Sequence, residues 1–226
     1  MQSSTYFHPS LASIAHPEFN HQLPHHCNCI HRNVPLRYNR SMSLTLNPDT
    51  SLLLIIDMQE RLLKVQHEPD SMLHSCLVLI QAAQTLNIPI LATTQNANRL
   101  GPMSTQMETY IDSKVHILDK ITFSVIKDEA CSDFIEHSDK NQIVICGVET
   151  HICVCQTALQ LLEDGYSPFV CADAVTSRSK ENHLNSLERM RTAGVQITSV
   201  ESSIYEWLAK AGTPEFRAIL PLFKAE

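Results

Sequence analysis

Residues 143–158 read Ile-Val-Ile-Cys-Gly-Val-Glu-Thr-His-Ile-Cys-Val-Cys-Gln-Thr-Ala. The stretch opens with an apolar run typical of a buried strand, turns at Gly147, and continues into a helical pattern that begins close to Cys153. Unpaired backbone N–H groups and the positive end of the helix dipole favour an anion at such a helix start. We therefore predict that the pKa of the Cys153 thiol is lowered there, so that the sulfur is a nucleophile at the end of a parallel sheet.

The rest of the sequence alternates short apolar runs with helical patterns. Runs rich in Ile, Val and Leu, without the polar alternation of a half-exposed strand, predict strands at 51–56, 88–93, 115–118, 142–146, 168–172 and 195–200. Helical patterns follow at 69–86, 128–137, 152–164, 180–193, 201–211 and from Thr213 onward. This alternation predicts right-handed crossovers and a parallel sheet with helices on both faces.

Composition narrows the class of partner. The formal net charge of −7 argues against non-specific binding to nucleic acid. No apolar run approaches the roughly 20 residues of a membrane span, so we expect no membrane partner either. The chain has eight cysteines, but Cys146 and Cys171 lie inside apolar strand patterns, where a free cysteine is an ordinary small core residue. We therefore expect a reducing, cytoplasmic setting.

Residues 1–41 differ from the rest, because they contain many histidines, one acid (Glu18) and no hydrophobic periodicity. Three interpretations stay open: a disordered tail, a targeting segment, or an over-long gene model in which Met42 is the true start. The chain is thus divided into an N-terminal extension, 1–41, and a single domain, 42–226. Five residues of the extension could form a metal cluster, but their spacing is not that of a zinc finger and we expect any such site to be adventitious: His25, His26, Cys27, Cys29 and His31.

Three ionisable residues follow predicted strands. Asp57 comes directly after the first strand, Lys120 after the third, and Cys153 after the fourth. Sites in parallel sheets form outside the carboxyl ends of the strands, so these residues could meet. A carboxylate can take a thiol proton and return it to a leaving amine, while an ammonium stabilises the negative charges. Each residue alone has a plainer explanation: a capping aspartate, a solvated lysine and a packed cysteine.

The same residues carry a family resemblance. Three stretches together resemble the isochorismatase-like cysteine hydrolases: Ile56-Asp57-Met58-Gln59, Lys120-Ile121-Thr122-Phe123-Ser124, and residues 147–154. The last third, with Asp164-Gly165-Tyr166 and residues 172–178, resembles the isochorismatase-domain-containing subgroup. The resemblance extends from about Leu46 to Lys224. It implies a three-layer α/β/α sandwich of Rossmann-like type with a six-stranded parallel sheet.

The resemblance also implies a mechanism. An Asp–Lys–Cys triad maps onto Asp57, Lys120 and Cys153, and the sulfur forms a thioester acyl-enzyme. A cis peptide is implied between Val148 and Glu149, which would turn backbone N–H groups, including that of Cys153, toward the oxyanion. No cofactor is implied.

One departure from the superfamily concerns the segment after the second strand. Nicotinamidases carry an Asp-x-His metal motif there, whereas this chain has residues 93–102 with Gln95. Carboxamides are poor ligands for a transition metal, so we expect no catalytic metal and do not expect nicotinamide as substrate.

We assign Gln59, Gln95, Phe123 and Thr150 to the substrate pocket. Two alternatives stay open: Gln95 could hold a turn through its amide, and Phe123 could belong to the core.

We therefore expect a metal-independent cysteine hydrolase that cleaves a small amide or related C–N bond. The alternatives are a non-catalytic interaction or scaffold protein that keeps the fold, and a thiol redox protein that pairs Cys153 with Cys155. Side chains two positions apart on a helix point about 200° apart around its axis, so Cys153 and Cys155 cannot readily form a disulfide. Cys155 fits the core better. The resemblance suggests a homo-oligomer, as does an apolar C-terminal segment that could equally pack on its own subunit: Phe216, Ile219, Leu220, Leu222 and Phe223.

Overall fold

A computed structural model of the chain describes residues 43–223. Our interpretations of residues 1–41, including the metal cluster, lie outside this range. The described residues form a six-stranded sheet in the order β3-β2-β1-β4-β5-β6, in which every pairing is parallel. The strands are β1 (Ser51–Ile56), β2 (Ile90–Gln95), β3 (His116–Lys120), β4 (Gln142–Val148), β5 (Ser167–Thr176) and β6 (Gln196–Thr198). The predicted parallel sheet is confirmed.

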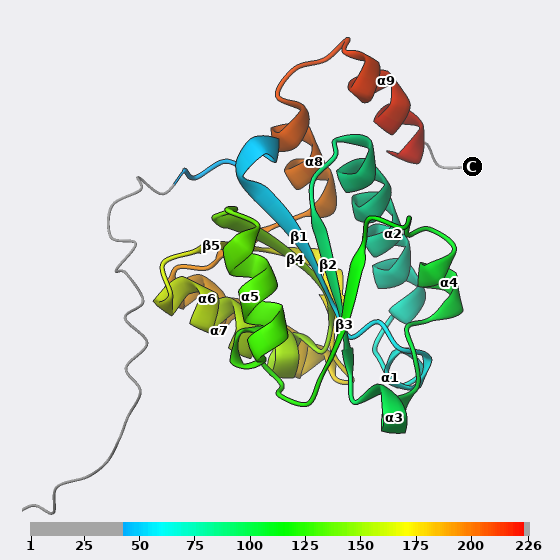
Figure 1. Cartoon of the computed structure of the whole chain (residues 1–226), viewed down its shortest axis with the longest axis vertical. Coiled ribbons are helices and arrows are strands. Elements are labelled where there is room, and N and C mark those ends of the chain that lie inside the picture. The colour runs from blue at the N-terminus through cyan, green and yellow to red at the C-terminus, as the bar shows by residue number, and fades with distance from the viewer. Residues whose placement is uncertain (1–42, 224–226) are drawn as a thin grey trace, which may run out of the picture. The chain divides into compact units, whose positions relative to one another are not determined.

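Helices cover both faces of this sheet, as Figure 1 shows. On one face pack α2 (Pro69–Thr85), α8 (Val200–Leu208) and α9 (Pro214–Ile219), and on the other α5 (Glu129–His137), α6 (Cys155–Glu163) and α7 (Lys180–Ala193). Alternate residues of β1 feed the two cores: Leu53 and Ile55 face the first, Leu52 and Leu54 the second. A strand buried on both faces must be apolar at every position, which explains the unbroken runs in the sequence.

The strand order reverses between β1 and β4. The chain builds β1, β2 and β3 outward in one direction, then returns to place β4 on the other side of β1. Connections therefore leave the carboxyl ends of β1 and β4 in opposite directions, and this is where parallel α/β sheets place their sites. Asp57 follows β1, and the turn that holds Cys153 follows β4.

Gly147 allows β1 and β4 to approach at this point. It pairs with Ile56 across the sheet and has a φ of 111°. A Cβ atom on Gly147 would lie 2.1 Å from the carbonyl oxygen of Ile56. A side chain is excluded there both by space and by backbone conformation.

Local structure departs from the sequence predictions at a few places. The segment predicted as a helix from 152 begins as a turn of π-helix, Thr150–Val154, and only then continues as α6. Three four-residue helices were not predicted: α1 (Glu60–Leu63), α3 (Ala97–Leu100) and α4 (Thr105–Glu108). A single turn shows no hydrophobic periodicity, so the sequence carries no signal for it. Gly194 ends α7 in the left-handed conformation, as expected.

The apolar C-terminal segment packs on its own subunit. Ile219 is fully buried, and Phe216, Leu222 and Phe223 pack against the core on the α2 side of the sheet. Among residues 43–223, no helix combines the length and apolar character needed to cross a membrane.

Candidate active site

The structure brings Asp57, Lys120 and Cys153 together at the carboxyl end of the sheet. Lys120 is the last residue of β3, and its ammonium Nζ lies 2.8 Å from Oδ2 of Asp57. The same Nζ lies 4.0 Å from Sγ of Cys153. Residues separated by 63 and 33 positions in the chain are thus in direct contact. This is the arrangement that the strand-end positions suggested.

Asp57 is held in a fixed orientation. It adopts a positive φ of 54° directly after β1, and its side chain is fully buried. One carboxylate oxygen, Oδ1, accepts a hydrogen bond of 2.8 Å from the hydroxyl of Thr93, which leaves Oδ2 for Lys120. A buried carboxylate needs such partners, because an unpaired buried charge is very costly.

Lys120 is only 1% exposed, and each of its three N–H donors has an oxygen acceptor. In addition to Asp57, Oε1 of Gln95 lies 2.8 Å from Nζ and the carbonyl oxygen of Thr122 lies 3.2 Å from it. A carboxylate and two further acceptors satisfy the hydrogen-bonding capacity of this buried ammonium. It provides a fixed positive charge beside the sulfur.

The Cys153 thiol is not activated in the way we predicted. Burial, followed by the negative charge of Asp57 and a hydrogen bond to it, raises the pKa of Cys153 to about 12. The charge of Lys120 and a hydrogen bond with the Glu149 backbone act in the opposite direction but are outweighed. The expectation of a lowered pKa is wrong, because the sulfur is buried beside a carboxylate. The resting group is therefore a neutral thiol.

The turn before Cys153 is fixed by contacts with the segment between β5 and α7. The peptide bond between Val148 and Glu149 is cis. The Glu149 carboxylate accepts hydrogen bonds from the backbone N–H and from Nε of Arg178, the latter at 3.0 Å. The backbone N–H of His151 donates to the hydroxyl of Ser177. The turn is thus tied to the chain that follows β5.

The residues assigned to the substrate pocket occupy different environments. Gln59 is buried and Gln95 half-buried, and both carboxamides contact protein atoms at each end. Phe123 is 55% exposed next to the end of β3, so it does not belong to the core. Thr150 is fully buried, and its hydroxyl lies 3.0 Å from Nδ1 of His183 on α7.

Sequence reasoning missed His183 and Thr93. Burial, together with the charge of His67, lowers the pKa of His183, which favours the neutral ring beside Thr150. His183 lies in a polar helix, and nothing in its spacing links it to Thr150. Thr93 could have been found, because it lies one strand away from Asp57 at the same end of the sheet.

Within residues 43–223, no group of three His, Cys, Asp or Glu side chains is arranged to hold a metal ion.

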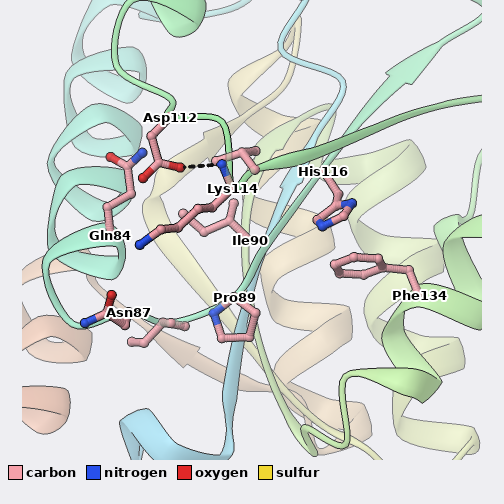
Figure 2. Close-up of a pocket in the computed structure, with 10 residues that line it drawn as sticks. Gln84, Asn87, Pro89, Ile90, Asp112, Lys114, His116 and Phe134 are labelled. Carbon is pink, nitrogen blue, oxygen red and sulfur yellow. Dashed lines mark hydrogen bonds between the residues drawn. The ribbon is translucent and has the colours of Figure 1, made fainter.

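A separate cavity of about 230 Å³ lies at the opposite end of the sheet, before β2 and β3 begin. Figure 2 shows Asp112 and Lys114 on one side of it, and His116 with Phe134 on the other. The two rings lie 4.7 Å apart. This cavity contains none of the residues assigned to the site.

Comparison with known proteins identifies the family. The family model for the Isochorismatase domain matches residues 51–202. The chain is 36% identical over 182 residues to the secreted isochorismatase effector Isc1 of Phytophthora sojae, covering 79% of this chain and 87% of the relative. It is 33% identical over 174 residues to isochorismatase domain-containing protein 2 of Xenopus laevis, covering 77% and 83%. The chain belongs to the isochorismatase family, a group of hydrolases, and its relatives include the isochorismatase domain-containing proteins.

Solved structures share the fold. A structure described as the MAR1 ribonuclease of Caenorhabditis elegans matches with a TM-score of 0.75 and 28% identity, covering 79% of this chain and 92% of that one. YcaC from Pseudomonas aeruginosa, solved with hexane-2,5-diol and covalent acrylamide, matches with a TM-score of 0.74 and 25% identity, covering 79% and 91%. The YcaC gene product of Escherichia coli, described as an octameric hydrolase of unknown specificity, has a TM-score of 0.75 at 22% identity, covering 81% and 92%.

Proposed function

We propose that this chain is a metal-independent cysteine hydrolase that cleaves a small amide or related C–N bond. The observation that carries the proposal is the buried cluster in which the Lys120 ammonium contacts both the Asp57 carboxylate and the Cys153 sulfur. A nucleophile, a base and a fixed positive charge in one buried cluster are what acyl transfer through sulfur requires.

The first half of the reaction forms a thioester. As Sγ of Cys153 bonds to the amide carbon, Asp57 takes the thiol proton and the carbonyl electrons move to oxygen. The C–N bond then breaks, and Asp57 returns the proton to the departing amine. Because the resting thiol is neutral, proton transfer and attack occur together. Lys120 offsets the negative charge that passes between sulfur and carboxylate.

The second half releases the acid. Asp57 takes a proton from a water molecule as the water oxygen attacks the thioester carbon. The S–C bond then breaks, and Asp57 returns the proton to the sulfur of Cys153. We assign the oxyanion site to backbone N–H groups of the turn at Val148, Glu149 and Cys153. The contacts of Glu149 with Arg178 would hold this turn in place throughout the cycle.

Metal independence is supported by the donors at the end of β2. Gln95 and Asn96 offer carboxamides, which bind transition metals poorly. The oxygen of Gln95 already accepts a hydrogen bond from Lys120. The chain supplies its positive charge with a lysine instead.

The proposed substrate is a small molecule. Of the four residues assigned to the pocket, Phe123 is the candidate to contact it, since its side chain is exposed whereas those of Gln59, Gln95 and Thr150 are engaged within the protein. Covalent acrylamide in the Pseudomonas aeruginosa relative shows a small amide bound to a protein of this fold. One structural neighbour is called a ribonuclease, but a net charge of −7 gives this chain little attraction for a phosphate backbone.

We further propose a reducing compartment such as the cytoplasm, because attack requires Cys153 as a free thiol.

We also propose that the chain self-associates. The octameric neighbour from Escherichia coli supports this, as do the exposed apolar side chains of Ile117, Ile121 and Phe123 along and beyond the edge strand β3.

A panel of small amides tests the proposal. The purified chain is incubated with acetamide, propionamide, benzamide and nicotinamide, and ammonia release is measured. We expect turnover of at least one amide, its loss in Cys153→Ala and Asp57→Asn, and its retention in the matched control Cys155→Ala, which removes a buried thiol two residues away. Turnover that survives in Cys153→Ala would overturn the proposal. No turnover of any amide in the panel by the folded chain would favour the scaffold alternative.

A further inference from the structure

We propose that Gln95 is a positioning residue, which fixes the Lys120 ammonium between Asp57 and Cys153; this rests on the proposed role of Lys120 beside the nucleophile. Gln95 is the last residue of β2 and pairs in register with Lys120 on β3. Side chains in register on neighbouring strands lie on the same face of the sheet. The carboxamide and the ammonium are therefore brought together by strand pairing itself.

The carboxamide of Gln95 can take only one orientation. Its oxygen, Oε1, accepts a hydrogen bond from Lys120 at 2.8 Å, and its nitrogen, Nε2, donates to the carbonyl oxygen of Ile121 at 2.7 Å. Rotation by half a turn would place N–H groups against an ammonium and an oxygen against a carbonyl. Both contacts would become repulsive, so the two partners lock the group.

Gln59 in turn fixes the backbone of Gln95. Its Oε1 accepts from the backbone N–H of Gln95 at 2.8 Å, and its Nε2 donates to the carbonyl oxygens of Gln95 and Gly101 at 3.2 and 2.6 Å. Gln59 is fully buried. The Gln59 carboxamide thus makes with the end of β2 the hydrogen bonds that a neighbouring strand would make. It therefore holds the end of β2 beside Lys120.

The charge of the cluster explains why an amide occupies this position. Asp57 and Lys120 together are neutral, and Gln95 supplies an acceptor without adding charge. A carboxylate in its place would leave the buried cluster with a net negative charge beside Cys153, and a second negative charge disfavours a thiolate. An apolar side chain would leave one N–H of the buried ammonium without its acceptor, so the ammonium would no longer be held between Asp57 and Cys153.

Alkylation kinetics of Cys153 test the positioning role without knowledge of the substrate. Acrylamide is used as the probe, modification of the Cys153 peptide is followed by mass spectrometry, and the saturating rate kinact is separated from the half-saturation constant KI across a pH series. For Gln95→Glu we expect kinact at each pH below the native midpoint to fall about 10-fold or more, and KI to stay within about 2-fold. Gln81→Glu is the matched control, because it adds the same charge on α2, at a glutamine whose side chain donates to the Leu77 carbonyl within the same helix.

A second pair of variants shows whether Gln95 acts through the lysine. Gln95→Met should lower kinact with KI unchanged, and it should have no further effect when Lys120 is already Met. A rise in KI with unchanged kinact would mean that Gln95 binds the probe, and would overturn the proposal. So would unchanged kinetics in both Gln95 variants, or full additivity with Lys120→Met.

The outcome is separable from that of the hydrolase proposal, since alkylation needs no hydrolysis. A chain that turns over no amide can still show the kinact effect, and a chain that turns over amides can lack it. If Gln95→Met does not fold, Gln95→Glu has the same length as the native side chain, and the split between its kinact and its KI, alone and combined with Lys120→Met, decides the question.

Discussion

Replacing Asp57 with asparagine should make Cys153 easier to alkylate while abolishing amide turnover. The negative charge of Asp57 and its hydrogen bond are, after burial, the main causes of the raised pKa of Cys153. Asparagine removes both and leaves the Lys120 charge, which acts to lower that pKa. Asparagine cannot accept the thiol proton, so the sulfur gains reactivity and the reaction loses its base.

The size of the effect follows from the charges involved. A neighbouring charge moves a pKa by about 1–3 units, so the midpoint of Cys153 alkylation should fall by that amount. At a fixed pH below the midpoint, each unit gives about tenfold more thiolate and a correspondingly faster reaction. Stability should fall as well, since both Asp57 and Lys120 side chains are 0% exposed. Breaking a buried pair by removing one partner costs about 3–5 kcal/mol.

The assay is the rate of iodoacetamide modification of the Cys153 peptide between pH 7 and pH 10, alongside urea unfolding. This range lies below the native midpoint, which is set by a pKa of about 12, so the rates of the two chains are compared at equal pH. Asp112→Asn is the control, because Asp112 lies by the cavity at the opposite end of the sheet. Slower alkylation in Asp57→Asn than in the native chain would refute the reasoning, because it would mean that proton removal by Asp57, and not the amount of thiolate, limits the reaction of Cys153 with iodoacetamide. A loss of stability below about 1 kcal/mol would show that the pair is not buried as described.

Three further predictions concern stability, each measured by urea unfolding. Gly147→Ala should cost more than about 3 kcal/mol, because its Cβ would meet the Ile56 carbonyl oxygen at 2.1 Å; a change below about 1 kcal/mol would contradict the close approach of β1 and β4. Burial raises the pKa of Cys131 from 9.0 to about 12, so from pH 9 upward the unfolded thiol ionises while the folded one stays neutral, and stability falls with rising pH. Cys131→Ala should make that decline shallower by about 1.4 kcal/mol per pH unit, and an unchanged slope would count against it. Ser179→Ala should cost about 1 kcal/mol, because the Ser179 hydroxyl accepts from the Asn182 N–H at the start of α7; no loss would mean that water replaces the cap.

The sequence was sufficient to predict the sheet and the proximity of Asp57, Lys120 and Cys153. Strands buried on both faces must be apolar throughout, so β1 and β4 could be recognised from composition alone. Parallel strands end at one edge, so Asp57 and Lys120 could be expected to meet despite their separation in the chain. Both inferences depend on periodicity and topology, which local sequence encodes.

The features of the site that could not be predicted depend on how deeply a side chain is buried and on which side chains it packs against. The helix start after β4 suggested a lowered pKa for Cys153, but the direction is set by burial and by the proximity of Asp57, which no local pattern reveals. Gln95 could be assigned to the site but not to its partner, because a carboxamide can face substrate or protein equally well. The contact of Thr150 with His183 joins the turn after β4 to α7, and no sequence pattern in either segment indicates that the two side chains meet.

The position of Lys120 has a consequence for how the proposed activity responds to heat. It ends β3, an edge strand that is hydrogen-bonded to β2 alone, whereas Asp57 and Cys153 follow the central strands β1 and β4. Edge strands detach at a lower free energy than the interior of a sheet. Gentle warming should therefore release the lysine first, and inactivation should come several degrees before the molecule as a whole melts. A stabiliser that shields the outer border of the sheet would then protect catalysis more than it raises the melting temperature.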